Sequence, residues 1–270
     1  MKRLLEAYDE NGVQRLAAMT LIHVVLMLLI GVFGGFISGL AGIGGAIIIY
    51  PAILLLPPLF GTPEYSAYIA SGLTSSQVLF STLSGSLSAI RKPEFHPSLV
   101  FYMGGGMITS SVIGAIFTNL LTTPVINGVY ICIALLALVL MVIKVQPRAE
   151  ANIHFNPYLL MIVGLCIGVV SGIIGAGGAF IIIPVLLALF KLPMNTVVAN
   201  SIVIAFISSI GAFLVKLVQG YVPLGNAMFL IIGSVCFAPI GLMVGRKLPN
   251  FVQKWIISLL IILAVIQLLF

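Results

Sequence analysis

The sequence predicts an all-α integral membrane protein made of two tandem repeats, each with about four transmembrane helices and a short re-entrant or broken helix at a glycine-rich motif. Three observations support this fold class: the composition, the length of the apolar runs and an internal duplication. Hydrophobic residues make up 61% of the 270 positions and charged residues 7%, whereas soluble domains contain roughly 45–50% and about 25%. The main solvent of this chain is therefore lipid.

Eight apolar runs are long enough to cross the hydrocarbon core of a bilayer. We expect full spans at 17–38, 66–89, 98–118, 124–143, 158–172, 196–217, 225–245 and 252–270. Two further apolar pieces, 46–56 and 179–190, are shorter, and their lengths favour half-helices or re-entrant segments over full crossings.

The orientation of the spans follows from the basic residues in the connections. An arrangement with eight spans makes the two repeats parallel and places the N-terminus and Arg91 on the inside. A ten-span arrangement with the N-terminus outside leaves the same number of basic residues inside, so the charge rule does not separate the two. We expect eight spans, because the two short pieces and the basic N-terminus favour them. Lys216 is then expected to extend from a helix end toward water.

An internal duplication organises the chain. Gly31–Pro51 reads GVFGGFISGLAGIGGAIIIYP and Gly164–Pro184 reads GLCIGVVSGIIGAGGAFIIIP, with eleven of twenty-one positions identical. Such repeats are common in secondary transporters. We expect a first transmembrane repeat at 1–143, a linker at 144–156 and a second transmembrane repeat at 157–270.

The glycines of the duplicated motif fall into two sets. In the first set, glycines recur every four residues on one helix face, a spacing that lets two helices approach closely. This set, which we expect to serve packing, contains Gly31, Gly35, Gly39, Gly164, Gly168 and Gly172.

In the second set, three glycines within four residues remove helix propensity and permit positive φ angles. This set contains Gly42, Gly44, Gly45, Gly175, Gly177 and Gly178. A helix break at membrane depth is tolerated where the backbone faces protein or a polar cavity. The half-helices that begin at Ala46 and Ala179 would point free N–H groups at that cavity, which suits an anion. The alternative is that both breaks only allow close packing.

Neutral polar side chains near the breaks are further candidate ligands for an anion. They are Ser38, Thr74, Ser75, Gln77, Ser171, Asn200 and Ser201. The alternative is that hydroxyl groups in apolar helices bond to their own backbone or across helices.

The absent residue types exclude several functions. The acidic residues lie at termini or in connections, so no carboxylate is available for a proton relay or a sodium site. The three histidines are neither paired nor spaced as metal ligands, so we expect no enzyme, no metal and no cofactor. The basic residues are scattered between apolar runs, which favours topology control over nucleic-acid binding.

The duplicated motif resembles that of the sulfite exporter TauE/SafE family of membrane permeases. The resemblance rests on SGLAGIGGAIIIYP at Ser38–Pro51 and SGIIGAGGAFIIIP at Ser171–Pro184, supported by Thr74-Ser75 and Asn200-Ser201. It implies transport of small inorganic or organic sulfur anions, such as sulfite or organosulfonates, across the cell membrane of a prokaryote. Asn200 stands where the first copy has Thr74, so the two half-sites are not equivalent.

We expect a secondary carrier whose two repeats rock against each other around a central site. The alternatives are a passive anion channel and a membrane protein with a structural role that does not involve transport. The coupling ion, the direction of transport and the oligomeric state stay open, with a homodimer as one alternative.

Overall fold

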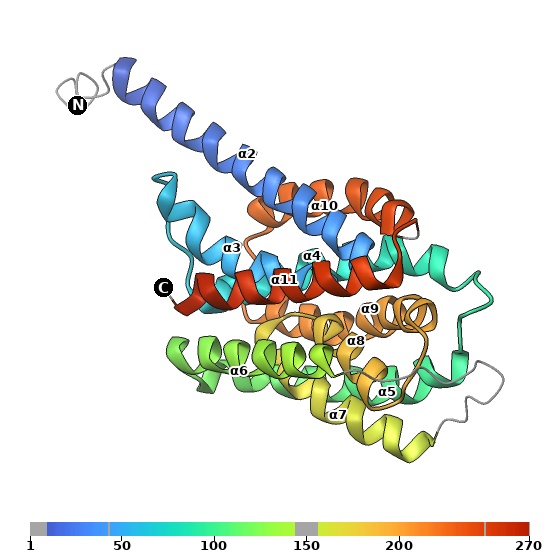
Figure 1. Cartoon of the computed structure of the whole chain (residues 1–270). Helices are drawn as coiled ribbons and strands as arrows, with labels where there is room; N and C mark the ends of the chain where they lie inside the picture. The colour runs from blue at the N-terminus through green and yellow to red at the C-terminus, as the bar shows by residue number, and fades with distance from the viewer. Residues whose placement is uncertain (1–9, 43, 144–155, 246, 270) are drawn as a thin grey trace.

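The computed structural model describes residues 10–42, 44–143, 156–245 and 247–269 (Figure 1). The first half contains α2 (Glu10–Ala41), α3 (Ala46–Leu59), α4 (Ala67–Ala89), α5 (Pro97–Phe117), the short 3-10 helix η1 (Thr118–Leu120) and α6 (Thr123–Val142). The second half contains α7 (Pro157–Ile174), α8 (Ala179–Ala188), α9 (Met194–Val218), α10 (Leu224–Gly245) and α11 (Asn250–Leu269). Within these described residues helices are the only regular elements and no strand occurs, which confirms the predicted all-α class.

Among the described residues, each half has four long helices and one short helix, as predicted. Six helices of the described chain, α2, α5, α6, α7, α9 and α10, are long and apolar enough to cross a membrane. The chain is therefore a multi-pass membrane protein. Residues 144–155 of the predicted linker lie outside the described residues, so the repeat boundaries stay a prediction.

Helix starts follow from local sequence signals. Pro97 and Pro157 occupy the first positions of α5 and α7, where the missing N–H group of proline is not needed. The Asn156 side chain accepts hydrogen bonds from the backbone N–H groups of Tyr158 and Leu159, at 3.1 and 3.4 Å. These caps fix where the long helices begin.

The glycines spaced four apart hold two pairs of parallel helices together, as predicted. On α2, a Cβ at Gly31, Gly35 or Gly39 would overlap the backbone of α10. On α7, the same is true of Gly164, Gly168 and Gly172 against α5. Backbone-to-backbone contact of this kind is available only to helices with small residues at the interface.

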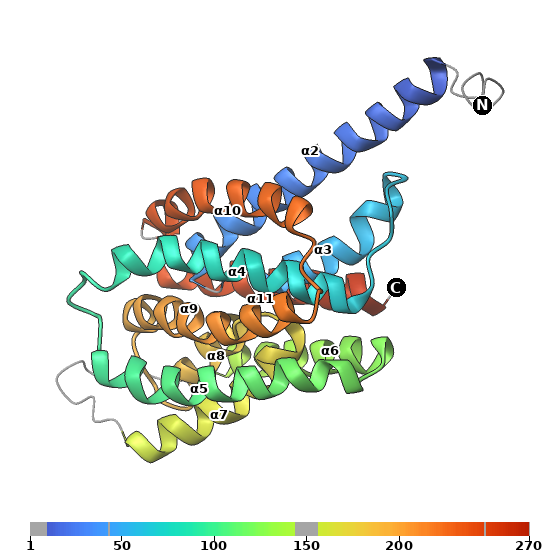
Figure 2. The ribbon, with the colours of Figure 1, turned by 180° about the vertical axis from the view of Figure 1, so that it is seen from behind.

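The antiparallel pair α4 and α9 forms the centre of the molecule. Figure 2 shows the two helices side by side, with α5 next to α9. Gly72 near the start of α4 lies against Tyr221 beyond the end of α9, and Gly85 near the end of α4 lies against Ile202 near the start of α9. Because α4 and α9 occupy the same position in the two halves, the halves have opposite directions.

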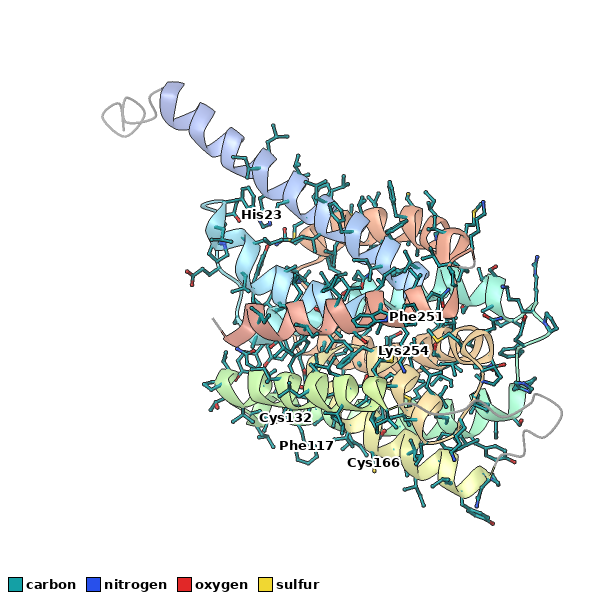
Figure 3. All side chains as sticks on the ribbon, in the orientation of Figure 1. His23, Phe117, Cys132, Cys166, Phe251 and Lys254 are labelled. Carbon is teal, nitrogen blue, oxygen red and sulfur yellow. The ribbon has the colours of Figure 1, made fainter. Side chains whose placement is uncertain are left out.

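The predicted parallel arrangement of the repeats is therefore wrong. The prediction treated the short apolar pieces as re-entrant segments that return to the side of the membrane from which they enter. Instead, α2 runs the whole length of the bundle and α3 runs back, so that the chain reverses at the first glycine cluster (Figure 1). At one end His23 of α2 and Tyr65 form a hydrogen bond, with Nε2 and the hydroxyl oxygen 2.9 Å apart; His23 is labelled in Figure 3.

The two ends of the bundle differ in charge. We call the end that carries the connections α4–α5, α8–α9 and α10–α11 the basic end. Its described basic residues are Arg91, Lys92, Lys191, Lys247 and Lys254, the last at the start of α11 (Figure 3). The opposite end, which carries the connections α3–α4, α5–α6 and α9–α10, also holds the start of α2 with Arg15, so fewer of the described basic residues lie there.

Candidate functional site

Both glycine clusters break their helices, as predicted. The φ angles of Gly42, Gly44 and Gly45 are 69°, 70° and 72°, and those of Gly175, Gly177 and Gly178 are 78°, 60° and 67°. Left-handed backbone of this kind is costly for residues with a Cβ, so each cluster needs its glycines. The chain leaves α2 at Ala41 and starts α3 at Ala46, and it leaves α7 at Ile174 and starts α8 at Ala179.

The first break is covered by α9, a helix of the other half. The Ser201 hydroxyl donates to the carbonyl oxygen of Gly42 at 3.2 Å, and the Val198 side chain lies beside the same glycine. On the other side of the break, Gly45 lies against the backbone of Gly34. The break is therefore enclosed by protein on both sides.

Gln77 of α4 points its amide at this first break. Its Nε2 lies 3.3 Å from the position that a Cβ on Gly45 would occupy, and 3.7 Å from the same position on Gly34. The side chain has an exposed fraction of 0%, and both Nε2 and Oε1 lack a hydrogen-bond partner among the described residues. Burying an amide in this way is unfavourable, so Gln77 is the residue of the site that most needs a ligand.

The other predicted polar residue of the first break is already bonded. The Ser38 hydroxyl donates to the Ser81 hydroxyl at 3.1 Å, and both side chains are fully buried. This bond joins α2 to α4 one turn before the break, which is a cross-helix contact of the kind that apolar bundles use for packing.

The second break is covered by α4 of the first half. A Cβ on Gly175 would overlap the carbonyl oxygen of Ser71 and would lie 3.3 Å from Cβ of Ser75. The Ser75 hydroxyl donates to the Gly72 carbonyl at 2.7 Å. Ser75 and Ser201 thus each lie at the glycine cluster of the opposite half, and each donates its hydroxyl proton to a backbone carbonyl.

Ser171 is the unbonded hydroxyl of the second break. Cβ of Ser171 lies 3.2 Å from the position of a Cβ on Gly178, its exposed fraction is 2%, and its Oγ lacks a hydrogen-bond partner among the described residues. Ser171 and Gly178 also border an apolar cavity of about 340 Å³ between α6, α7 and α8. Ser208 of α9 is a second buried hydroxyl without a described partner, and the sequence analysis did not identify it.

The two half-helices begin near each other in the interior. Tyr130 of α6 stacks on Tyr50 of α3, with ring centroids 5.1 Å apart, and lies 6.1 Å from Phe180 of α8. Its hydroxyl donates to the carbonyl of Ile47 in the first turn of α3. Tyr130 was not predicted from the sequence, because a tyrosine in an apolar span gives no local sign of its partners.

Backbone N–H groups without a partner in their own helix lie at both half-helix starts. Within α3 the first hydrogen bonds run from Ile48 and Ile49 to the Gly45 carbonyl, at 3.1 and 3.2 Å, so the N–H groups before them have no partner in their own helix. In α8 the corresponding bonds run from Ile181 and Ile182 to Gly178, both at 3.0 Å. The positive end of each helix dipole lies at the same helix start as these N–H groups.

Two of the predicted residues are turned elsewhere. The Thr74 hydroxyl donates to the Ala70 carbonyl of its own helix at 2.7 Å. The Asn200 amide donates to the carbonyls of Glu94 and Thr196 and accepts from the His96 N–H group at 2.8 Å. Asn200 therefore fixes the connection between α4 and α5, and the structure does not bring it together with the glycine clusters.

Lys216 contradicts its prediction. It was expected to reach water from the end of α9, but its exposed fraction is 0%. Its Nζ donates to Ser71 Oγ at 2.9 Å, to Thr118 Oγ1 at 3.3 Å and to the Ile173 carbonyl at 3.1 Å. These acceptors come from α4, η1 and α7, so nothing near Lys216 in the sequence reveals them.

A cavity of about 230 Å³ opens at the basic end. Its lining includes Lys92 and Glu94 from the α4–α5 connection and Leu40 and Val198 close to the first break. Because Val198 also contacts Gly42, one layer of side chain separates this cavity from the first break.

Comparisons with known proteins agree with this architecture. The family model described as sulfite exporter TauE/SafE matches residues 27–268. Probable membrane transporter protein YunE of Bacillus subtilis is 24% identical over 268 residues, covering 91% of this chain and 97% of the relative. Probable membrane transporter protein MJ0441 of Methanocaldococcus jannaschii is 25% identical over 273 residues, covering 92% and 97%.

YdhB of Bacillus subtilis, also named a probable membrane transporter protein, is 26% identical over 255 residues, covering 93% of this chain and 100% of the relative. No solved structure matches the chain. The family and these relatives identify a membrane transporter and not an enzyme. The family model spans most of the sequence, including both glycine clusters, and the chain belongs to the sulfite exporter TauE/SafE family.

Proposed function

We propose that the protein is a secondary carrier for small sulfur-containing anions, such as sulfite or organosulfonates, in the cell membrane of a prokaryote. The observation that carries the proposal is the buried amide of Gln77, which lacks a described partner and lies beside Gly45 at the start of α3. An oxyanion placed there would accept from Nε2 and from the N–H groups at the start of α3, which have no partner in their own helix.

The charges around the breaks favour an anion over a cation. Helix N-termini carry partial positive charge and bind oxyanions readily. The acidic residues of the described chain are Glu10, Glu64 and Glu94, at the start of α2 and in two connections. A metal cation held by side chains would need ligands that converge on the site, and no group of three or more His, Cys, Asp or Glu residues is found among the described residues.

The proposed site consists of donors from both halves. Backbone N–H groups near Gly44, Gly45, Gly177 and Gly178 bind the anion, and Gln77 and Ser171 supply side-chain donors. The proposed substrate-binding set also keeps Ser38, Gly42, Thr74, Ser75, Gly175, Asn200 and Ser201. Of these, Thr74 and Ser75 donate to carbonyls of their own helix, Ser38 donates to Ser81, and Asn200 bonds to the α4–α5 connection and to Thr196.

The opposite directions of α4 and α9 suit alternating access. In carriers with inverted halves, a site at mid-depth opens to one side when one half takes the conformation of the other. Basic residues are enriched on the cytoplasmic side of membrane proteins, so we assign the basic end to the cytoplasm. The cavity at that end then forms a cytoplasmic approach to the first break.

The function is tested with purified protein. A thermal melting screen with sulfite, thiosulfate, an alkanesulfonate, sulfate and chloride should show stabilisation by at least one sulfur anion, since a ligand of the folded state raises the melting temperature. In proteoliposomes, the same anion should support counterflow, the transient accumulation of labelled substrate against a gradient of unlabelled substrate.

Each alternative function predicts a different result. A passive anion channel gives flux without counterflow and without saturation. A protein with a structural role gives no anion-dependent shift and no flux. Stabilisation by chloride alone would overturn the proposed substrate class, because the free donors would then serve a halide.

A further inference from the structure

Lys216 lies next to the second break. Its acceptor Ile173 is in the last turn of α7, two residues before Gly175. Its acceptor Ser71 is the residue whose carbonyl fills the space beside Gly175. Ser71 therefore contacts both the lysine and the glycine cluster, and Ser75, one turn further along α4, contacts the same cluster.

The hydrogen bonds around Nζ have the pattern that a protonated amine requires. The Ser71 hydroxyl donates its own proton to the Tyr68 carbonyl at 2.7 Å, and the Thr118 hydroxyl donates to the Gly114 carbonyl at 3.1 Å. Both hydroxyl oxygens must then accept from Nζ, as must the Ile173 carbonyl. Three acceptors match the three N–H donors of an ammonium group, whereas a neutral amine has two.

The charge on this ammonium group is not balanced by the protein. Its three described acceptors are two hydroxyls and a carbonyl, all neutral, and no ion pair of Lys216 is found in the described part of the chain. A buried charge without a counter-ion is costly, and ionisable residues inside membranes mark ion and substrate pathways. The Ile173 carbonyl lies at the negative end of the α7 dipole, which offsets part of this cost.

The two halves differ at this position. With Ser201 aligned to Ser75, Lys216 aligns to Ile90, so the first half has no equivalent charge. Lys216 also lies toward the end opposite the basic end, because its acceptor Thr118 belongs to the α5–α6 connection. Among the described residues, the second break therefore has a buried basic side chain close to it and the first break has none.

Resting on the proposed function, we infer that Lys216 is the charged ligand of the transported oxyanion. Its ammonium group exchanges the hydrogen bond to Ser71 or Thr118 for one to an anionic oxygen at the second break. Because Ser71 contacts both Lys216 and Gly175, this exchange takes place beside the second glycine cluster.

The test compares Lys216→Gln, Lys216→Arg and the control Lys191→Gln, which removes an equal charge from a connection. The melting screen first identifies an anion that stabilises the wild type. For that anion we expect Lys216→Gln to raise Kd at least about tenfold, a loss of roughly 1.4 kcal/mol of binding free energy. Lys216→Arg should retain part of the affinity, and Lys191→Gln should bind as the wild type does.

The outcomes separate this inference from the proposed function. If Lys216→Gln folds, melts as the wild type does without ligand, and binds the anion with unchanged Kd, Lys216 is a structural residue and the inference fails while the proposed function stands. If the wild type binds an oxyanion without sulfur in a manner that depends on Lys216, the inference stands and the substrate class fails. If Lys216→Gln does not fold, Lys216→Met, which is neutral and similar in length, takes its place, and an unchanged Kd in that variant would overturn the inference.

Discussion

The side-chain amide of Gln77 lies beside Gly45, with Nε2 3.3 Å from the position that a Cβ on that glycine would occupy. The pair joins the middle of α4 to the start of the half-helix α3. Neither polar atom of the amide has a partner among the described residues, so the same contact that completes the candidate site also lowers the stability of the fold.

Replacing Gln77 by Leu should separate stability from function. Leu has a similar size and removes both unpaired polar atoms, so we expect the free energy of unfolding to stay the same or to rise by about 1 kcal/mol. The anion-dependent melting shift should disappear. Thermal melting with and without the anion measures both effects.

Ser76→Ala is the matched control for Gln77→Leu, since Ser76 is its buried neighbour and donates to the Gly72 carbonyl at 2.9 Å. The control should leave the anion shift intact. If Gln77→Leu keeps the full shift, the amide is not a ligand and the proposed site is wrong.

Replacing Gly45 by Ala should abolish transport. Ala at φ 72° is strained, and its Cβ would overlap the Gly34 backbone. Gly61→Ala is the control, because Gly61 has a φ angle of 69° and nothing within 4 Å of its Cβ position. Relative to this control, Gly45→Ala should lose about 1–3 kcal/mol of unfolding free energy and most of its counterflow. Equal stability and equal counterflow in the two variants would show that the tight turn at Gly45 is not required.

The positions of the helices and of both breaks follow from local sequence, whereas their direction does not. Apolar run length sets where a span begins and ends, and three glycines in four residues suffice to predict that a helix stops at Gly42 or Gly175. The direction of the second half depends on whether the 14 residues of α3 reverse the direction of the chain. The distribution of basic residues gives equal support to the eight-span and ten-span arrangements.

The ligand contacts of individual side chains are also invisible in the sequence. A lysine near the end of an apolar span is expected to extend toward water, yet Lys216 is buried against Ser71, Thr118 and Ile173, which lie 43 to 145 positions away. Asn200 has the signal of a membrane-buried donor, yet the His96 and Glu94 backbone uses its amide. Such outcomes depend on tertiary packing, which no window of neighbouring residues contains.

The interface between α2 and α10 should be intolerant of side-chain volume. A Cβ at Gly35 would overlap the backbone of Ser234, whereas Gly105 on α5 has nothing within 4 Å of its Cβ position. We expect Gly35→Val to lower the free energy of unfolding by about 1–3 kcal/mol and Gly105→Val to change it little. Reversible unfolding in mixed micelles measures the difference, and similar values for the two variants would contradict the observed close packing.

The orientation of the second half can be tested by cysteine labelling. With the basic end in the cytoplasm, Gly225 at the start of α10 lies outside the cell and Lys247 after the end of α10 lies inside. The eight-span arrangement reverses both positions.

The native cysteines Cys132, Cys166 and Cys236 are free and exposed, so they are first replaced by serine. In intact cells, a membrane-impermeant thiol reagent should then modify Gly225→Cys but should modify Lys247→Cys only after the cells are made permeable. Gly225 has nothing within 4 Å of its Cβ position, so the new side chain fits without strain. The opposite labelling pattern would place the basic end outside, and it would require the cavity at Lys92 and Glu94 to face the medium instead of the cytoplasm.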